Sequence, residues 1–296
     1  MVQYEFDVAF HSHGVRLAGR FIRDTNDSSL RQPAVVVTGS WLTVKEQMPL
    51  VYARRLADAG FTAFIFDFAG FGESDGAPRQ CEMPARKIVD ITSAADFVRT
   101  MSFVGKVGHL AICASAQYAL AALARGAPID SYACVAGWHH DAASVAPFYG
   151  GKEGVDRRMA YAHEASRKFS QTGEQSLVPA YEAGNDRAGM FFPLDYYARA
   201  ERGAVPEWKN EMDEASWRYW LTFDGLSSAA RVLTPTLLVH SDGSVLPDHV
   251  RQIHRQLAGP KELVWTEGSQ VDFYDLPPYV ARAMQAVKPW FDQTLR

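Results

Sequence analysis

The chain has 296 residues, of which 47% are hydrophobic and 22% are charged, and this composition excludes collagen-like, coiled-coil and disordered proteins. Its formal net charge is −4, from 30 basic and 34 acidic residues, and no run of lysines and arginines stands out, so we expect neither a nucleic-acid partner nor a polybasic contact with a membrane. The three cysteines, Cys81, Cys113 and Cys134, have no metal-binding or redox spacing, and their odd number is typical of a reduced, cytoplasmic protein.

The predicted elements alternate between short apolar strands and helices. A hairpin comes first, with strands at 4–10 and 15–21 around the turn His13-Gly14. Further buried strands are predicted at 34–37, 62–66, 109–113, 132–136, 236–240 and 262–265. Helices are predicted from Met48 to Gly60, at 85–101 and 247–257, and at the end of the chain through Trp290. Continuous apolar strands that alternate with helices indicate the α/β class, with a mostly parallel sheet covered on both faces.

A segment of about 90 residues between Trp138 and Arg231 is far longer than an ordinary connection. Its pattern is helical and rich in aromatic residues, and an insert at the carboxyl edge of a parallel sheet lies where ligands bind. We therefore interpret 139–230 as a helical cap over a pocket, and 1–138 together with 231–296 as the core. Most of the aromatic residues are expected to form the insert's own core. The candidate substrate contacts are Trp41, Tyr118, Trp138, Phe191, Tyr197 and Trp217.

The segment 109–120 is a strand, a turn of small residues and a helix, with Ser115 in the turn. This is the layout of a nucleophile elbow, which holds a serine oxygen above the sheet. The N–H of Ala116, at the start of the helix, would donate to an oxyanion. The usual G-x-S-x-G pattern reads C-x-S-x-Q here, because Cys113 and Gln117 replace both glycines. The alternative interpretations are that Ser115 caps the helix and that Cys113 is a small buried hydrophobic residue.

With these features the chain resembles proteins of the α/β-hydrolase fold, close to bacterial esterase-like members related to dienelactone hydrolases and to fungal polyketide transferases. The motifs that carry the resemblance lie at 44–47, 67–76, 112–118, 138–141 and 268–275, and it covers nearly the whole chain. The resemblance implies acyl chemistry with a serine nucleophile, a histidine base, an acid and two backbone amides in an oxyanion hole. It places the second amide at Ser40 or Trp41. Lys45-Glu46 can equally be the solvated start of a helix.

The catalytic residues of this fold follow the order serine, acid, histidine along the chain. Asp242, after the strand at 236–240, is the expected acid, and Asp248 is a second candidate. The histidine is expected after the last strand, where the residue is Gln270. Glutamine has no basic atom near neutral pH and cannot act as a general base. The sequence therefore lacks a standard triad.

Three explanations remain open. Gln270 can be an engineered inactivation. The base can come from His139-His140-Asp141. His140 would accept the Ser115 proton, and Asp141 or Asp242 would orient its imidazole. The alternative role for His140 is a hydrogen-bonded anchor of the cap. Finally, Ser115 need not be a nucleophile, in which case the pocket binds a ligand or catalyses proton transfer or elimination.

We expect a serine-dependent acyl hydrolase, similar to an esterase, thioesterase or lactonase, that acts on a medium-sized apolar substrate. The alternatives are an acyltransferase, a cyclase or lyase on the same fold, and a binding protein without a working base. His11 and His13 lack a carboxylate partner for a metal, and no nucleotide-binding pattern is present, so no cofactor is expected. The first 14 residues do not resemble a signal peptide, and no membrane contact is expected. The expected partner is a small molecule, and a homodimer is one option.

Overall fold

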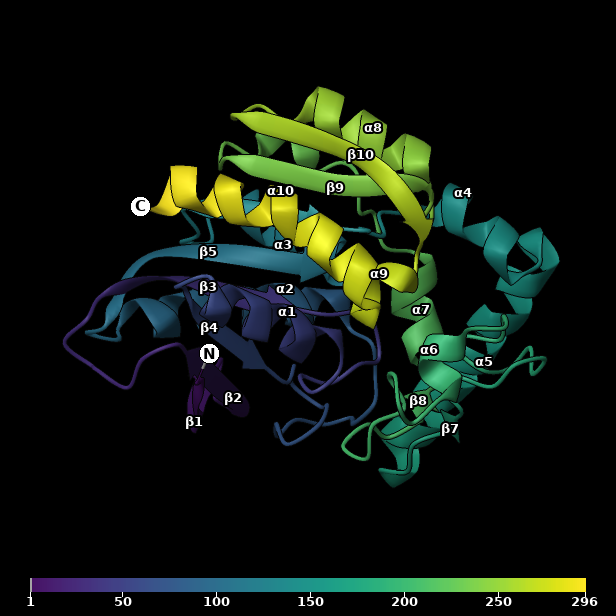
Figure 1. Cartoon of the computed structure of the whole chain (residues 1–296). Coiled ribbons are helices and arrows are strands. Elements are labelled where there is room, and N and C mark those ends of the chain that lie inside the picture. The colour runs from purple at the N-terminus through teal and green to yellow at the C-terminus, as the bar shows by residue number, and fades with distance from the viewer. Residues whose placement is uncertain (1) are drawn as a thin grey trace.

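The computed structural model describes residues 2–296 and has an eight-stranded sheet as its centre (Figure 1). The strands lie in the order β1 (Tyr4–Ser12), β2 (Val15–Arg23), β4 (Thr62–Phe66), β3 (Gln32–Thr38), β5 (Val104–Ile112), β6 (Ser131–Val135), β9 (Thr236–Gly243) and β10 (Lys261–Ser269). β1 pairs with β2 and β2 with β4 in antiparallel fashion. All neighbours from β4 to β10 are parallel. The predicted α/β class, with its N-terminal antiparallel hairpin, is confirmed.

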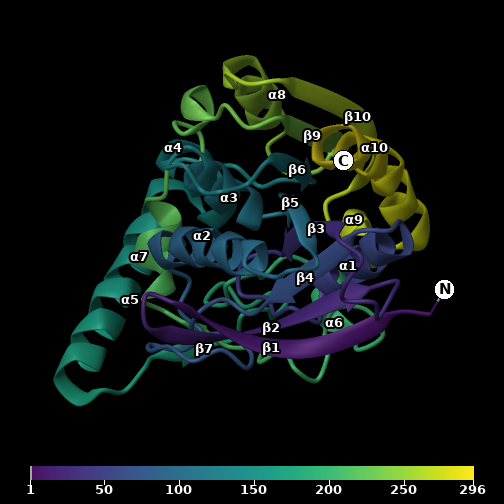
Figure 2. The same ribbon diagram turned by 90° about the vertical axis from the view of Figure 1, so that its left-hand side faces the viewer.

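Helices cover both faces of the sheet. Figure 2 shows α1 (Met48–Asp58) and α10 (Pro277–Leu295) on one side, and α2 (Pro84–Arg99) and α3 (Ser115–Leu123) on the other. The shorter α8 (Pro247–Gln256) packs beside β9. Burial on both faces explains the continuous apolar strands: all five residues of β4 and of β6 are buried.

The predicted boundaries differ from the observed ones at β5, and this difference affects the site. β5 begins at Val104, five residues before the predicted start, because Gly105 and Lys106 interrupt the apolar run that served as its signal. It ends at Ile112, so Cys113 belongs to the turn and not to the strand.

The segment 139–230 lies beyond the carboxyl ends of the parallel strands (Figure 1). It contains α4 (Ala142–Val145), η1 (Ala146–Tyr149), the long α5 (Gly151–Thr172), α6 (Asp195–Ala198) and α7 (Ser216–Leu221). A small two-stranded sheet of β7 (Leu177–Val178) and β8 (Met212–Asp213) joins them, and η2 (Ala229–Arg231) leads back to β9. Within residues 2–296, no helix combines the length and the hydrophobicity that crossing a membrane requires.

Candidate active site

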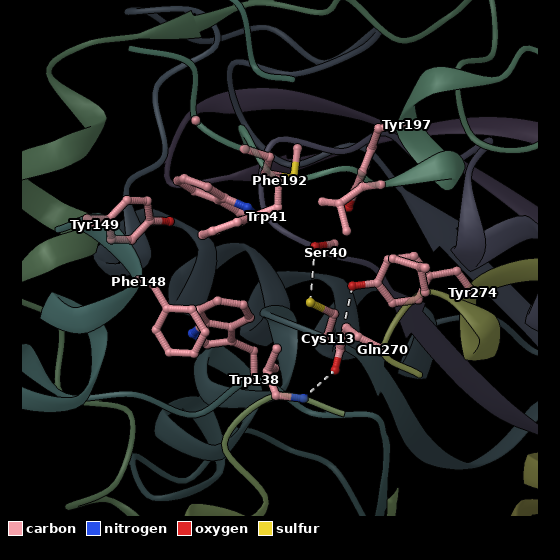
Figure 3. Close-up of a pocket in the computed structure, with 15 residues that line it drawn as sticks. Ser40, Trp41, Cys113, Trp138, Phe148, Tyr149, Phe192, Tyr197, Gln270 and Tyr274 are labelled. Atoms are coloured by element: carbon pink, nitrogen blue, oxygen red, sulfur yellow. Dashed lines mark hydrogen bonds between the residues drawn. The ribbon is translucent and has the colours of Figure 1, made fainter. Parts of the chain in front are cut away.

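The turn between β5 and α3 has Cys113 at its apex. Cys113 has a φ of +59°, a left-handed conformation that is strained for a residue with a side chain. A strained turn from strand to helix that exposes one side chain above the sheet is the geometry of a nucleophile elbow. The Cys113 side chain lines a cavity at the carboxyl edge of the sheet (Figure 3). The residue at the apex of this turn is therefore Cys113 and not Ser115.

Ser115 and Ala116 lie beyond the apex. The Ser115 hydroxyl is fully buried and donates to the carbonyl of Ile112 at 3.2 Å, and Ser115 does not line the cavity. The N–H of Ala116 donates to the carbonyl of Cys113 at 3.1 Å, so it is not free for an oxyanion. The predicted elbow is therefore two residues too far along the chain: the window from Ala111 to Ser115 fits the pattern with Cys113 at its centre.

The cavity has a volume of about 280 Å³ and neutral walls. None of the residues that line it is an aspartate, glutamate, lysine, arginine or histidine. Its apolar side chains are Trp41, Trp138, Phe148, Met190, Phe192, Leu194, Val245 and Val271, and its polar side chains are Ser40, Cys113, Tyr149, Tyr197, Gln270 and Tyr274. Such a cavity suits an uncharged organic group, since a charged one would lose its hydration without gaining a partner.

The Cys113 sulfur has polar neighbours at the base of the cavity. The Ser40 hydroxyl, from the loop after β3, donates to the Cys113 Sγ at 3.2 Å (Figure 3). Burial raises the pKa of the Cys113 thiol above its ordinary value, and this effect outweighs the hydrogen bonds from Ser40, Tyr274 and the Ala114 N–H, which act in the opposite direction. Cys113 is therefore mainly a neutral thiol near pH 7.

Two backbone amides face no carbonyl in this region. Neither the N–H of Ala114, the residue after Cys113, nor that of Trp41 donates to another backbone group in the described chain. Both belong to the segments that surround the sulfur, and Trp41 also lines the cavity. In this fold the amide after the nucleophile and one from the loop after the equivalent of β3 form the oxyanion hole. The amide beside the Cys113 sulfur is thus that of Ala114 and not that of Ala116.

A buried ion pair fixes the loop that carries Ser40 and Trp41. Glu82 is fully buried and accepts hydrogen bonds from the Leu42 N–H at 3.0 Å, from the Lys87 Nζ at 2.7 Å and from the Tyr118 hydroxyl at 2.7 Å. The Leu42 carbonyl accepts from the Trp208 indole at 2.7 Å. Both sides of the Leu42 peptide unit are thus held, and this fixes a residue whose φ is +57°.

Gln270 follows β10 and lines the cavity, and both ends of its amide make hydrogen bonds. Its Nε2 donates to the Ala136 carbonyl at 2.7 Å and to the Tyr274 hydroxyl at 3.3 Å. Its Oε1 accepts from the Val245 N–H at 3.1 Å. Gln270 therefore connects the segments that follow β6, β9 and β10, in the place where the resemblance expects a base.

The predicted acid lies outside the site. The side chain of Asp242 is 72% exposed; it pairs with Arg251 at 2.6 Å and accepts from the Trp265 indole at 3.1 Å. The hydrogen bond from Arg251 lowers the pKa of Asp242. Asp248 pairs with the same arginine at 2.9 Å. Neither carboxylate lines the cavity, and both pair with Arg251 of α8 instead.

His140 is an anchor of the cap rather than a base within reach of the sulfur. Its Nδ1 accepts from the Trp138 indole at 2.8 Å, and its Nε2 lies 2.7 Å from the Trp220 carbonyl. Burial lowers the pKa of His140 to about 4, and the ring does not line the cavity. Asp141 caps α4, because its carboxylate accepts from the Ser144 N–H at 2.8 Å.

Three of the six candidate substrate contacts line the cavity, namely Trp41, Trp138 and Tyr197. The other three, Tyr118, Phe191 and Trp217, do not line it. Tyr118 binds Glu82, Phe191 packs on Phe192 with ring centroids 4.4 Å apart, and Trp217 is fully buried against Tyr149 at 5.0 Å. Neither Cys113 nor Tyr274 was predicted as a site residue. The predicted strand at 109–113 included Cys113, whereas β5 ends at Ile112.

Comparisons with known proteins place these features in a family. No protein-family model matches the sequence. Among curated proteins, the chain is 26% identical to the uncharacterised protein YcjY of Escherichia coli over 291 residues, which cover 91% of each chain. It is 30% identical to a thiohydrolase of Eupenicillium brefeldianum over 239 residues, which cover 75% of this chain and 73% of the relative. It is also 35% identical to the polyketide transferase claH of Penicillium crustosum over 117 residues, or 38% of each chain.

Solved structures share the whole fold. A hypothetical protein from Pseudomonas aeruginosa, PA2218, superposes with a TM-score of 0.86 at 24% identity, over 99% of this chain and 94% of the other. The α/β hydrolase GrgF from a Penicillium species superposes with a TM-score of 0.82 at 19% identity, over 99% of both chains. The chain therefore belongs to the α/β-hydrolase superfamily and, within it, to the family that contains the fungal thiohydrolase.

Proposed function

We propose that the protein is a cysteine-dependent acyl-transfer enzyme whose substrates are thioesters of medium-sized, uncharged acyl groups. The observation that carries this proposal is the Cys113 thiol, which is held in a left-handed turn and lines a cavity without charged walls. The proposal assigns to Cys113 the nucleophilic role that the sequence analysis gave to Ser115. The volume of about 280 Å³ is near the lower end of the range for small-molecule pockets, about 300–1,000 Å³.

The first half of the reaction transfers the acyl group to the enzyme. The Cys113 sulfur adds to the thioester carbonyl carbon, and the electron pair of the C=O bond moves onto oxygen, where the N–H groups of Ala114 and Trp41 stabilise it. When the C=O bond re-forms, the bond from carbon to the donor sulfur breaks. The proton that Cys113 gives up is matched by the proton that the departing thiolate takes up, so the exchange is neutral in protons.

The neutral surroundings of the sulfur favour thioesters over ordinary esters. A departing thiolate has a conjugate acid of pKa about 8.5, which is below the raised pKa of the attacking Cys113 thiol, so it can leave without a general acid. A departing alkoxide is far more basic, comparable with hydroxide from water of pKa about 15.7, and needs a general acid. The Tyr274 phenol hydrogen-bonds the Cys113 thiol, but burial raises the pKa of Tyr274 well above its ordinary value, which makes it a poor acid. The activity named for the fungal thiohydrolase supports the same substrate class.

Intact-mass spectrometry tests this proposal. The protein is incubated with the hexanoyl thioester of N-acetylcysteamine, and the adduct is located by peptide mapping. We expect one hexanoyl group on Cys113, none in Cys113→Ala, and normal labelling in Ser115→Ala, since the Ser115 hydroxyl lies outside the cavity. An adduct on Ser115 would return the nucleophilic role to that residue. Folded protein that forms no adduct would show that the cavity is a binding site or serves another chemistry.

A further inference from the structure

We propose that the acyl group on Cys113 passes to a thiol and not to water, so that the protein exchanges acyl groups between two thiols. This inference rests on the proposed function, because it concerns the second half of the same reaction. It follows from the groups that surround the Cys113 sulfur, which decide whether water can be activated there.

Among residues 2–296, no side chain beside the sulfur can take a proton from water near neutral pH. The neighbours are the Ser40 hydroxyl, the phenols of Tyr197 and Tyr274, and the Gln270 amide. A hydroxyl and an amide are not bases in this range. Burial raises the pKa of Tyr197 and of Tyr274, so both phenols keep their protons. Once Cys113 carries the acyl group, its sulfur is no longer a base either.

Gln270 does not replace a base, because an amide oxygen takes up no proton from water near neutral pH. Its Oε1 accepts a hydrogen bond from the Val245 N–H at 3.1 Å, which holds the side chain in place. Its Nε2 donates to the Ala136 carbonyl at 2.7 Å. Both ends of the amide are thus used to hold the segments after β6 and β9 together, and the residue is a structural bridge.

The histidines at the same edge of the sheet do not supply the base. His139, His140 and His240 are buried, and none of them lines the cavity. Burial lowers the pKa of His139 to about 3 and of His140 and His240 to about 4. Moreover, His140 uses both ring nitrogens, at 2.8 Å to the Trp138 indole and 2.7 Å to the Trp220 carbonyl.

A thiol acceptor needs no such base, because a thiol of pKa about 8.5 is a few per cent thiolate at pH 7. The acceptor thiolate adds to the acyl carbon, and the bond from that carbon to the Cys113 sulfur breaks. Hydrogen bonds from Ser40, Tyr274 and the Ala114 N–H stabilise the Cys113 thiolate as it departs. Cys113 then takes up one proton, equal to the one that the acceptor lost on ionisation. The overall reaction therefore has one thioester and one thiol as substrates and one thioester and one thiol as products.

The lifetime of the acyl-enzyme tests the inference. Hexanoyl-Cys113 is prepared from a hexanoyl thioester, the donor is removed by rapid desalting, and the adduct is followed by intact mass at pH 7. N-acetylcysteamine or ethanol is then added at equal concentration, and a third sample receives no acceptor. We expect the thiol to discharge the adduct at least about 100-fold faster than water alone, the low end of what a general base supplies. The product should be a new thioester, and ethanol should have no effect.

The outcomes separate the two proposals. An adduct that disappears equally fast without thiol, with hexanoic acid as the product, would overturn the thiol-acceptor inference and leave the proposed function standing. If no donor places an acyl group on Cys113, the proposed function itself fails.

A pair of variants at one position tests the physical reason. Gln270→His introduces an imidazole beside the sulfur, and Gln270→Asn keeps an amide without a basic atom. Both variants are compared after a thermal melt has confirmed that they fold. We expect the hexanoyl adduct to hydrolyse at least about tenfold faster in Gln270→His than in Gln270→Asn, a modest share of a full general-base effect. Equal rates in the two folded variants would show that a missing base is not what protects the thioester.

Discussion

The buried pair of Glu82 and Lys87 gives the sharpest test of how the loop after β3 is held. Replacing Glu82 by Gln keeps the shape of the side chain but leaves the Lys87 ammonium without its partner at 2.7 Å. Both side chains are at most 2% exposed, so water cannot replace the lost charge. Breaking a buried pair on one side costs about 3–5 kcal/mol, and we expect Glu82→Gln to lower the free energy of unfolding by that amount at pH 7.

The size of this loss should depend on pH. Burial lowers the pKa of Lys87, and Glu82 opposes that shift. Without Glu82 the pKa of Lys87 in the folded protein falls further, whereas the unfolded chain binds the proton up to a pKa of about 10.4. Unfolding then takes up a proton, so stability rises with pH by at most about 1.4 kcal/mol per unit. The deficit of Glu82→Gln relative to the parent protein should therefore shrink from pH 7 to pH 9.

Urea unfolding of three variants measures these effects. Glu82→Gln combined with Lys87→Met removes both charges, and the methionine can pack against Phe68 and Phe71, whose rings lie 4.7 and 4.6 Å from the Lys87 nitrogen. We expect the double variant to recover most of the stability lost in Glu82→Gln, while Lys87→Met alone stays unstable. A Glu82→Gln protein within about 1 kcal/mol of the parent, or a double variant no better than the single one, would refute the reasoning.

Three further predictions concern titration and the nucleophile. Because burial raises the pKa of the Cys113 thiol, the rate of acylation by a thioester should rise about tenfold per pH unit from pH 7 to pH 9 without a plateau. The rate in Cys113→Ala is subtracted as background. A plateau near neutral pH would indicate a base. Cys113→Ser should acylate at least about 100-fold more slowly, since no base activates its hydroxyl, and retention of the parent rate would contradict the base-free site. Burial lowers the pKa of His109 and His139 to about 3 and of His140 and His240 to about 4, so unfolding takes up protons below pH 6.5. The urea midpoint should therefore fall from pH 7 to pH 5, and an unchanged midpoint would argue against buried neutral histidines.

The periodicity of the sequence was sufficient to predict the sheet. Strands that are buried on both faces must be apolar throughout, and the predicted strand at 62–66 coincides with β4 (Thr62–Phe66). The hairpin around His13-Gly14 is also found, because both residues adopt the positive φ that such a turn requires. These features depend on local composition, which a sequence displays directly.

The site was less predictable, because it depends on where a strand ends to the single residue. Cys113 and Ser115 share the small neighbour Ala114 and lie only two residues apart, so the pattern of the elbow can be placed on either one. Only the end of β5 at Ile112, with a φ of +59° at Cys113, decides between them. The position of Gln270 was predictable from chain order, but its engagement with Val245 and Ala136 was not, because those contacts join three separate strand ends.

The cysteine at the apex and the glutamine after β10 have to be interpreted together. A serine hydroxyl without a base is almost never ionised near neutral pH, so a serine at the apex of this turn would be a very weak nucleophile. A thiol loses less reactivity without a base, since its ordinary pKa of about 8.5 is far closer to neutral than that of a hydroxyl. At a site with Cys113 beside Gln270, the rate of acyl transfer therefore follows the small fraction of each thiol that is ionised. Such a site favours a thioester as the acyl donor, because its thiolate leaves without a general acid. It favours a thiol as the acceptor, because a thiol ionises without a general base.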